Sequence, residues 1–261
     1  MPLITLTSDF GLQDYYVGAM RGAILRLAPE AQLVDLSHCI PPQDLLEGAW
    51  VLRHAATEFP PGTIHLALID PGVGSARRPL VLASGGYLWV GPDNGLFSFA
   101  LQTPGWQARE ISNPALRGPR LSSTFHGRDL FAPTAAHLAG GFPLAEVGPL
   151  VSDPVCLEEA SPQWEGQELV GQVIHVDRFG NLTTNIPAEA VASWREGWQL
   201  HLGASQVLSQ LCRTYADAPP DALLALIGSA GLLEIAVNGG SAARRLRMGR
   251  RGQVRLELPS S

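Results

Sequence analysis

The first half of the chain alternates between short apolar runs and longer segments in which apolar residues recur at helical spacing. Residues 3–7 are rich in β-branched side chains, and apolar positions at helical spacing follow from 16 to 27. Residues 32–36 predict a second strand, and residues 45–59 predict a second helix. Residues 63–69 are nearly all apolar, which is typical of a central strand covered on both faces by helices. The pattern predicts an open α/β sheet.

The pattern changes beyond residue 155. Up to that point, strands at 80–83 and 87–91 and a helix at 130–138 continue the alternation. Residues 156–169 mix proline, serine and acidic residues without a sustained period, which predicts a linker between domains 1–155 and 170–261. Short strands separated by turn residues predict a smaller, β-rich and barrel-like C-terminal domain. Its strands are expected at 170–177, 182–186, 198–202, 224–228, 232–237 and 252–258.

Composition excludes several classes of protein. The chain has 261 residues, 46% of them hydrophobic, and a net charge of −6. This charge argues against a general nucleic-acid binder, because such proteins neutralise phosphates with clustered Lys and Arg. Cys39, Cys156 and Cys212 form no CxxC pair, and the histidines show no HxxxH or HExxH spacing, so we expect neither a disulfide framework nor a metal site. No window approaches the roughly 20 apolar residues of a membrane span, and we expect a soluble, cytoplasmic protein.

Two carboxylates follow strands of the predicted sheet. Asp9 comes after the first strand, and Asp70 ends the most apolar strand, directly before the turn at residues 71–74. Both are candidate site residues, because ligands bind at the carboxyl ends of strands in open α/β sheets. Each could instead open a turn or cap a helix. Asp9 could accept both hydroxyls of a ribose, but the loops lack the GxGxxG and Walker patterns of a pyrophosphate site.

Three further segments carry polar groups that could serve a site or only the fold. The loop at 124–129 (TFHGRD) holds a histidine, a guanidinium and a carboxylate, although His126 could be a structural histidine. Arg77 and Arg78 could be a solvated pair, and residues 91–95 (GPDNG) could be an ordinary tight turn. These alternatives stay open on residue types alone.

The segment at 177–181 (DRFGN) follows a predicted strand of the C-terminal domain and offers a carboxylate, an aromatic face and an amide. An aromatic plane beside an asparagine suits adenine, which needs stacking and a paired donor and acceptor at its edge. A simple turn explains the same residues equally well. Composition and spacing therefore predict a two-domain α/β protein with a candidate nucleoside site.

Several motifs recur along almost the whole chain in a fixed order. They are TSDFG at 7–11, DLSH at 35–38, DPGVG at 70–74 with Arg77-Arg78, GPDNG at 91–95, FHGRD at 125–129, DRFGN at 177–181 and the segment 228–238. Together these motifs resemble the S-adenosylmethionine (SAM) hydroxide adenosyltransferase family, whose relatives include the fluorinase and the chlorinase.

The resemblance implies an enzyme that hydrolyses SAM to adenosine and methionine without a metal or cofactor. The family's water-handling residues fall on Asp70, Arg77 and His126. The halogenase relatives have Tyr at the position of Asp70 and lack His126, and the fluorinase has Ser at the position of Gly127. A carboxylate beside a halide would repel it, so we expect hydrolysis rather than halogenation. A non-catalytic adenosine or SAM sensor is the other alternative.

The resemblance also implies the substrate contacts and the assembly. Asp9 is expected at the ribose diol, where Gln43 replaces the Trp of the fluorinase. The other expected contacts are Phe179, Asn181, Val237 and Gly239 at the adenine, Asp14, Asp177 and Ser229 at the methionine end, and Glu234 near the nucleoside. The family further implies a homotrimer in which each site lies between the first domain of one subunit and the second domain of its neighbour. No nucleic-acid or membrane partner is expected.

Overall fold

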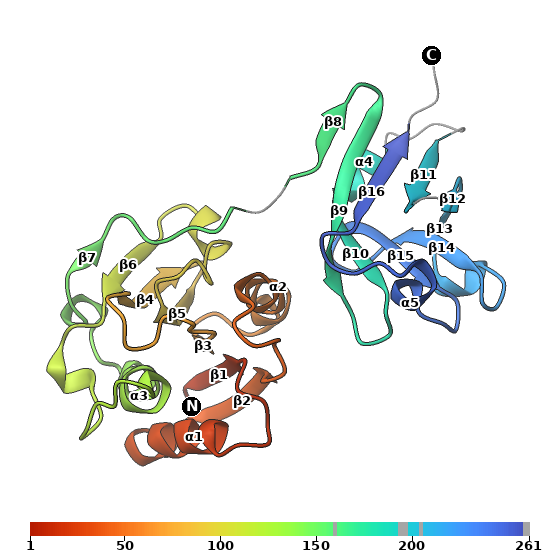
Figure 1. The fold of residues 1–261 in the computed structure, drawn as a ribbon. Helices are drawn as coiled ribbons and strands as arrows, with labels where there is room; N and C mark the ends of the chain where they lie inside the picture. The colour runs from red at the N-terminus through yellow and green to blue at the C-terminus, as the bar shows by residue number, and fades with distance from the viewer. Residues whose placement is uncertain (159–160, 193–197, 204–205, 258–261) are drawn as a thin grey trace. The chain divides into compact units, whose positions relative to one another are not determined.

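The structure is a computed structural model that describes all residues except 159–160, 193–197, 204–205 and 258–261. The chain divides into two units, Met1–Glu158 and Glu159–Ser261, and each has its own sheet and its own hydrophobic core (Figure 1). The predicted fold class, an α/β sheet unit followed by a smaller unit built on a curled sheet, is confirmed.

The sheet of the first unit has the strand order β2-β1-β3-β5-β4-β6-β7. Neighbours are parallel from β2 to β5 and antiparallel from β5 to β7. The chain passes from β1 to β2 on one side and then to β3 on the other, so the strand order reverses between β1 and β3, where open sheets bind ligands. The strands are β1 (Leu3–Ser8), β2 (Gln32–Ser37), β3 (Ile64–Leu68), β4 (Pro79–Ser84), β5 (Tyr87–Pro92), β6 (Gln107–Glu110) and β7 (Leu150–Val151).

Helices cover both faces of this sheet (Figure 1). Leu66 and Leu68 pack in one core with α1 and α3, whereas Ala67 and Ile69 pack in a second core with α2. Successive side chains of a strand point to opposite faces, so an all-apolar β3 serves both cores. The prediction of a central strand covered on both faces is confirmed. The helices are α1 (Tyr16–Leu27), α2 (Leu45–Ala55) and α3 (Ala132–Ala139).

Some elements differ from the predictions. The helix predicted over 45–59 ends at Ala55 and continues as a 3₁₀ turn over Ala56–Glu58, because Pro60 and Pro61 follow and cannot continue a helix. A π-helical turn, Gly127–Phe131, precedes α3. Strands β6 and β7 were not predicted, since four and two residues are too few for a recognisable alternation. Within the described part of the chain, no helix is long and apolar enough to cross a membrane.

Four further 3₁₀ turns complete the short helical elements of the described residues. They are Ala100–Gln102, Pro114–Leu116, Leu144–Glu146 and Tyr215–Asp217.

The sheet of the second unit has the order β12-β11-β16-β9-β10-β15-β14-β13, with β8 paired to β9. The first residues of β9 pair with β16 and its last residues pair with β10, so this strand joins two parts of a curled sheet around one core. Strand β8 and the start of β9 lie in the segment expected to be a linker. The strands are β8 (Gln163–Glu165), β9 (Glu168–Val176), β10 (Leu182–Pro187), β11 (Gln199–Leu202), β12 (Gln206–Leu208), β13 (Leu211–Cys212), β14 (Leu223–Ile227), β15 (Leu232–Val237) and β16 (Gln253–Glu257), and the helices are α4 (Ala188–Ala192) and α5 (Ala242–Leu246).

A histidine is buried in the first unit. His65 on β3 is fully buried, its Nδ1 lies 2.7 Å from the hydroxyl of Thr5, and its ring stacks on Trp89. Its Nε2 is buried without a hydrogen-bond partner among the described residues. Burial lowers the pKa of His65 to about 4, so the folded protein holds this ring neutral.

We expect His65 to make the protein sensitive to acid. Because its pKa falls from 6.5 to about 4 on folding, the unfolded chain binds a proton more readily between these values, and the free energy of unfolding decreases as the pH falls through this window. The decrease amounts to about 3 kcal/mol. Denaturant titrations at several pH values should show a smaller decrease for His65→Gln than for the wild type. Equal pH dependence in both proteins would contradict this assignment.

Candidate active site

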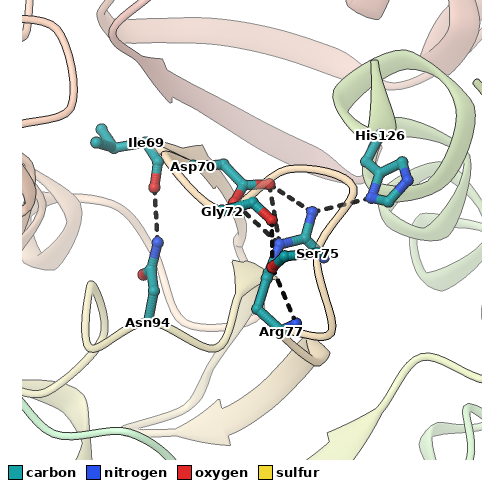
Figure 2. Close-up of polar contacts among 7 residues, drawn as sticks. All are labelled: Ile69, Asp70, Gly72, Ser75, Arg77, Asn94 and His126. Atoms are coloured by element: carbon teal, nitrogen blue, oxygen red, sulfur yellow. Dashed lines mark hydrogen bonds and ion pairs between the residues drawn. The ribbon is translucent and has the colours of Figure 1, made fainter. Parts of the chain in front are cut away.

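The structure brings Asp70, Arg77 and His126 together (Figure 2). The Nε of Arg77 donates to Oδ1 of Asp70 at 2.9 Å, and its Nη2 donates to Oδ2 at 2.5 Å. The same Nη2 lies 2.9 Å from Nδ1 of His126. Two nitrogens of one planar guanidinium thus hold the carboxylate, and one of them also holds the imidazole.

A tight turn after β3 positions the first two of these side chains. The hydroxyl of Ser75 donates to the carbonyl of Gly72 at 2.7 Å and accepts from the backbone N–H of Arg77 (Figure 2). Gly74 has a φ of +78°, and a Cβ there would come within 2.5 Å of the carbonyl oxygen of Ser123. The turn therefore needs glycine at this position.

The GPDNG segment supports the same turn from the neighbouring strand. The side-chain amide of Asn94 donates to the carbonyl of Ile69, directly before Asp70, at 2.8 Å (Figure 2). Asp93 is buried and accepts from Nε of Arg78 at 2.8 Å. These residues form a turn, as the simpler interpretation of the motif predicted, and this turn also fixes the end of β3.

The contact with Arg77 determines the tautomer of His126. A guanidinium only donates hydrogen bonds, so Nδ1 of His126 must accept, and the proton of the neutral ring must lie on Nε2. Burial and then the positive charge of Arg77 lower the pKa of His126, against the opposing charges of Asp70 and Asp129. The ring is therefore neutral near pH 7 and presents an Nε2–H donor.

The triad is largely shielded from water. The side chains of Asp70 and Arg77 are 9% and 10% exposed, and the guanidinium lies 5.2 Å from the ring centre of Phe131. His126 immediately precedes the π-helical turn. A Cβ on Gly127 would lie 3.1 Å from side-chain atoms of both Leu68 and Met20. A larger residue at position 127 would therefore crowd the support of His126.

The other charged residues of these motifs pair with each other. Arg128 donates to both oxygens of Asp129, at 2.6 and 2.8 Å, and this contact is the main cause of the lowered pKa of Asp129. Arg78 bridges Asp93 and Asp153. These four residues stabilise loops and contribute no group to the triad.

Asp9 lies at the same edge of the sheet as Asp70. Ser8 pairs with Leu68 in the parallel register of β1 and β3, so both carboxylates follow adjacent strand ends. The Oδ2 of Asp9 accepts from the backbone N–H of Gln43 at 2.8 Å. Asp14 is exposed in the loop that precedes α1.

In the second unit, the turn between β9 and β10 brings together Asp177 and Asn181. The backbone and side-chain nitrogens of Asn181 donate to the two oxygens of Asp177, at 2.8 and 2.9 Å. Asn181 is 8% exposed, whereas Phe179 is 76% exposed at the tip of the turn. Gly180 packs against Ser241 so closely that a Cβ would lie 2.0 Å from its hydroxyl oxygen.

The remaining predicted contacts lie on β15 and in the turns at its ends. Ser229 is exposed between β14 and β15, Glu234 is half-buried on β15, Val237 is buried at the end of this strand, and Gly239 is exposed with a φ of +77°.

Tyr215 is a residue that the sequence reasoning missed. Its hydroxyl donates to Oε1 of Glu234 at 2.7 Å. This bond, burial and the charges of Glu234 and Asp177 raise the pKa of Tyr215 to about 12. Tyr215 thus joins two predicted contacts, Asp177 and Glu234. The capping-box pattern of Thr214 and Asp217 marked this turn in the sequence, although it says nothing about the site.

Metal ligands do not cluster in the part of the chain that the structure describes. Within those residues, no group of three or more His, Cys, Asp or Glu side chains could hold a metal ion.

Residues 4–148 match the family model of the SAM hydroxide adenosyltransferase N-terminal domain, and residues 171–255 match that of the C-terminal domain. An (R)-S-adenosyl-L-methionine hydrolase of Salinispora arenicola is 42% identical over 98% of this chain and 97% of its own length. A fluorinase of Nocardia brasiliensis is more distant, with 30% identity over 93% of this chain and 92% of its own length. The crystal structure of an uncharacterized conserved protein from Thermotoga maritima superimposes with a TM-score of 0.89 at 34% identity, covering 97% of this chain and 99% of that one. The chain belongs to the SAM hydroxide adenosyltransferase family.

Proposed function

We propose that this protein is an enzyme that hydrolyses SAM to adenosine and methionine, by attack of water on the 5′ carbon of the ribose. The arrangement of Asp70, Arg77 and His126 carries the proposal, because it combines a carboxylate acceptor with a neutral imidazole donor. The related hydrolase of Salinispora arenicola supports the same reaction.

The sulfonium of SAM is a good leaving group, so the site has to orient a water molecule and take up its proton. The water oxygen accepts a hydrogen bond from Nε2–H of His126, and one of its hydrogens points to Asp70. As the oxygen bonds to the 5′ carbon, the carbon–sulfur bond breaks and methionine leaves as a neutral thioether. The proton passes to the carboxylate of Asp70, since His126 already holds its proton on Nε2 and its Nδ1 is occupied by Arg77.

The substrate contacts are proposed from the two units. Asp9 accepts both ribose hydroxyls, and Phe179 packs on the adenine. The Nδ2 of Asn181 is engaged by Asp177, so Oδ1 of Asn181 is the atom that accepts from the exocyclic amine of adenine. The backbone at Val237 and Gly239 takes the rest of the adenine edge.

The methionine end of SAM carries an ammonium group beside the sulfonium. Carboxylates suit both charges, and the proposed contacts there are Asp14, Asp177 and Ser229, with Glu234 and its partner Tyr215 near the nucleoside. The carboxylates Asp177 and Glu234 act together on Tyr215, which supports placing them in one subsite.

We further propose a cyclic homotrimer in which each site combines the first unit of one subunit with the second unit of its neighbour. The first unit exposes an apolar surface beside its candidate site, where Leu12 is 69% exposed and Tyr15 is 65% exposed. Tyr15 contacts Phe125, which precedes His126. Burial of this surface against a second copy would stabilise such an assembly. The cytoplasm is the proposed location, supported by three cysteines that are free thiols.

Product analysis tests the reaction. The protein is incubated with SAM in ¹⁸O-labelled water with chloride present, and the products are separated by chromatography and weighed by mass spectrometry. We expect methionine and adenosine with one ¹⁸O in its 5′ hydroxyl. Free adenine would indicate cleavage of the glycosidic bond, 5′-chloroadenosine would indicate a halogenase, and unchanged SAM at full binding would indicate a sensor.

In the same assay, Asp70→Ala and His126→Ala should hydrolyse SAM about 10²- to 10⁴-fold more slowly, because each removes one positioned proton-handling group. Their affinity for adenosine, measured by calorimetry, should stay near that of the wild type. Glu30→Ala removes an exposed carboxylate from the loop before β2 and is the matched control. Wild-type turnover in either triad variant would remove that residue from the mechanism.

Nuclear magnetic resonance tests the role of His126 as a donor. The ¹⁵N shifts of its imidazole at neutral pH should show a neutral ring with the proton on Nε2. In Arg77→Met, the loss of the guanidinium charge should raise the pKa of His126. The signals of His201, which pairs with Glu257 in the second unit, should not change. A proton on Nδ1 in the wild type would refute the proposed direction of proton transfer.

Mixed assemblies test the shared site. Asp70→Ala and Asn181→Ala chains, each impaired alone, are mixed, dissociated and reassembled. In a trimer with sites between subunits, about a quarter of the sites would combine an intact first unit with an intact second unit, and activity should recover accordingly. An active monomer by light scattering, or no recovery from trimers shown to contain both chains, would rule out this assembly.

A further inference from the structure

A chain of buried polar groups lies beside the candidate site, outside the triad. Ser8 at the end of β1 is fully buried, and His38, which follows β2, is 3% exposed. The hydroxyl of Ser8 lies 2.7 Å from Nδ1 of His38. The other ring nitrogen, Nε2, lies 3.2 Å from Oδ1 of Asp35, which also pairs with Arg21 of α1.

The partners of His38 suggest a single direction for these hydrogen bonds. An Asp35 carboxylate only accepts, so Nε2 of His38 carries a proton. In the neutral ring Nδ1 then accepts from the hydroxyl of Ser8, and the oxygen of Ser8 keeps a lone pair for the backbone N–H of Phe10 at 3.4 Å. Every polar group of the chain is satisfied in this arrangement, so it holds the ring in one orientation.

The same histidine holds the loop that carries Asp9. Its imidazole binds Ser8 on one side of Asp9, and its backbone carbonyl accepts from the N–H of Gly11 on the other side at 2.8 Å. Further along the segment that follows His38, Gln43 donates its N–H to Asp9. Gln43 has a φ of +66°, a strained conformation for this residue, and such strain occurs where surrounding contacts fix the backbone.

The order Ser8, His38, Asp35 also has the composition of a nucleophilic hydrolase triad. Ser8, however, is fully buried on a strand end within the sheet, and a nucleophile must reach its substrate. The geometry therefore supports a positioning role and not a second catalytic centre.

We propose that His38 and Ser8 are positioning residues that hold the carboxylate of Asp9 in the orientation that binds the two hydroxyls of a ribose. The proposal rests on the proposed function, because it takes Asp9 as the ribose contact. It makes His38 a determinant of specificity for ligands with an intact 2′,3′-diol. Without His38 or Ser8, the loop from Asp9 to Gly11 loses its attachment to the segment after β2, and the carboxylate no longer meets both hydroxyls.

The test compares two ligands that differ only in the diol. Affinities of adenosine and 2′,3′-dideoxyadenosine are measured by titration for the wild type, Asp9→Ala, Ser8→Ala and His38→Phe. We expect Ser8→Ala and His38→Phe to weaken adenosine binding about tenfold and to leave dideoxyadenosine binding unchanged, as in Asp9→Ala. Ser84→Ala is the matched control, because it removes another buried hydroxyl, bonded to the carbonyl of Ala100, and should change neither affinity.

A double variant separates positioning from a general effect on the fold. In Ser8→Ala with Asp9→Ala, the first change should have no further effect on adenosine affinity, because its only route is through Asp9. Equal weakening of both ligands by Ser8→Ala and His38→Phe would overturn the proposal, and so would unchanged affinities where Asp9→Ala weakens adenosine. If Asp9→Ala itself leaves adenosine affinity unchanged, the ribose contact is wrong and the positioning role falls with it.

Discussion

The guanidinium of Arg77 joins the end of β3 to the segment before α3, and the candidate site depends on this contact. Its planar fork neutralises the carboxylate of Asp70 and leaves one N–H for Nδ1 of His126. Lysine could not reproduce this, because an ammonium is a point charge without a rigid pair of donors. The low exposure of the ion pair requires that its polar atoms stay satisfied, so displacement of Arg77 would leave a poorly solvated carboxylate.

The sheet brings the ends of its strands to the place where this contact forms. Asp9 and Asp70 follow β1 and β3, the strands on either side of the reversal in strand order, and His38 follows β2 next to them. Small residues permit the close approach of the loops, as the positive φ of Gly74 against Ser123 shows. The topology therefore accounts for the position of the site, and the loop residues account for its chemistry.

The sequence predicted the layered α/β unit because β1, β3 and α1 have strong, regular apolar patterns, and the limits of α1 agree with the predicted residues 16–27. It identified Asp70, Arg77 and His126 only through the resemblance, since these residues lie in different segments and no local spacing connects them. The tautomer of His126 could not be predicted, because it depends on which atom of Arg77 faces the ring. Tyr215 and the contact between Ser8 and His38 were missed for the same reason: their partners are distant in sequence.

The charges of the triad bear on the choice of nucleophile. Arg77 contributes one positive charge, the carboxylate of Asp70 cancels it, and the lowered pKa of His126 keeps the ring neutral. A halide entering this site would lose its hydration and meet a carboxylate without any excess positive charge to stabilise it. Water loses less on entering and finds both a donor, Nε2–H of His126, and an acceptor, Asp70. The site is therefore built for a neutral nucleophile that must release a proton, whereas an anion needs no acceptor and would be repelled by one.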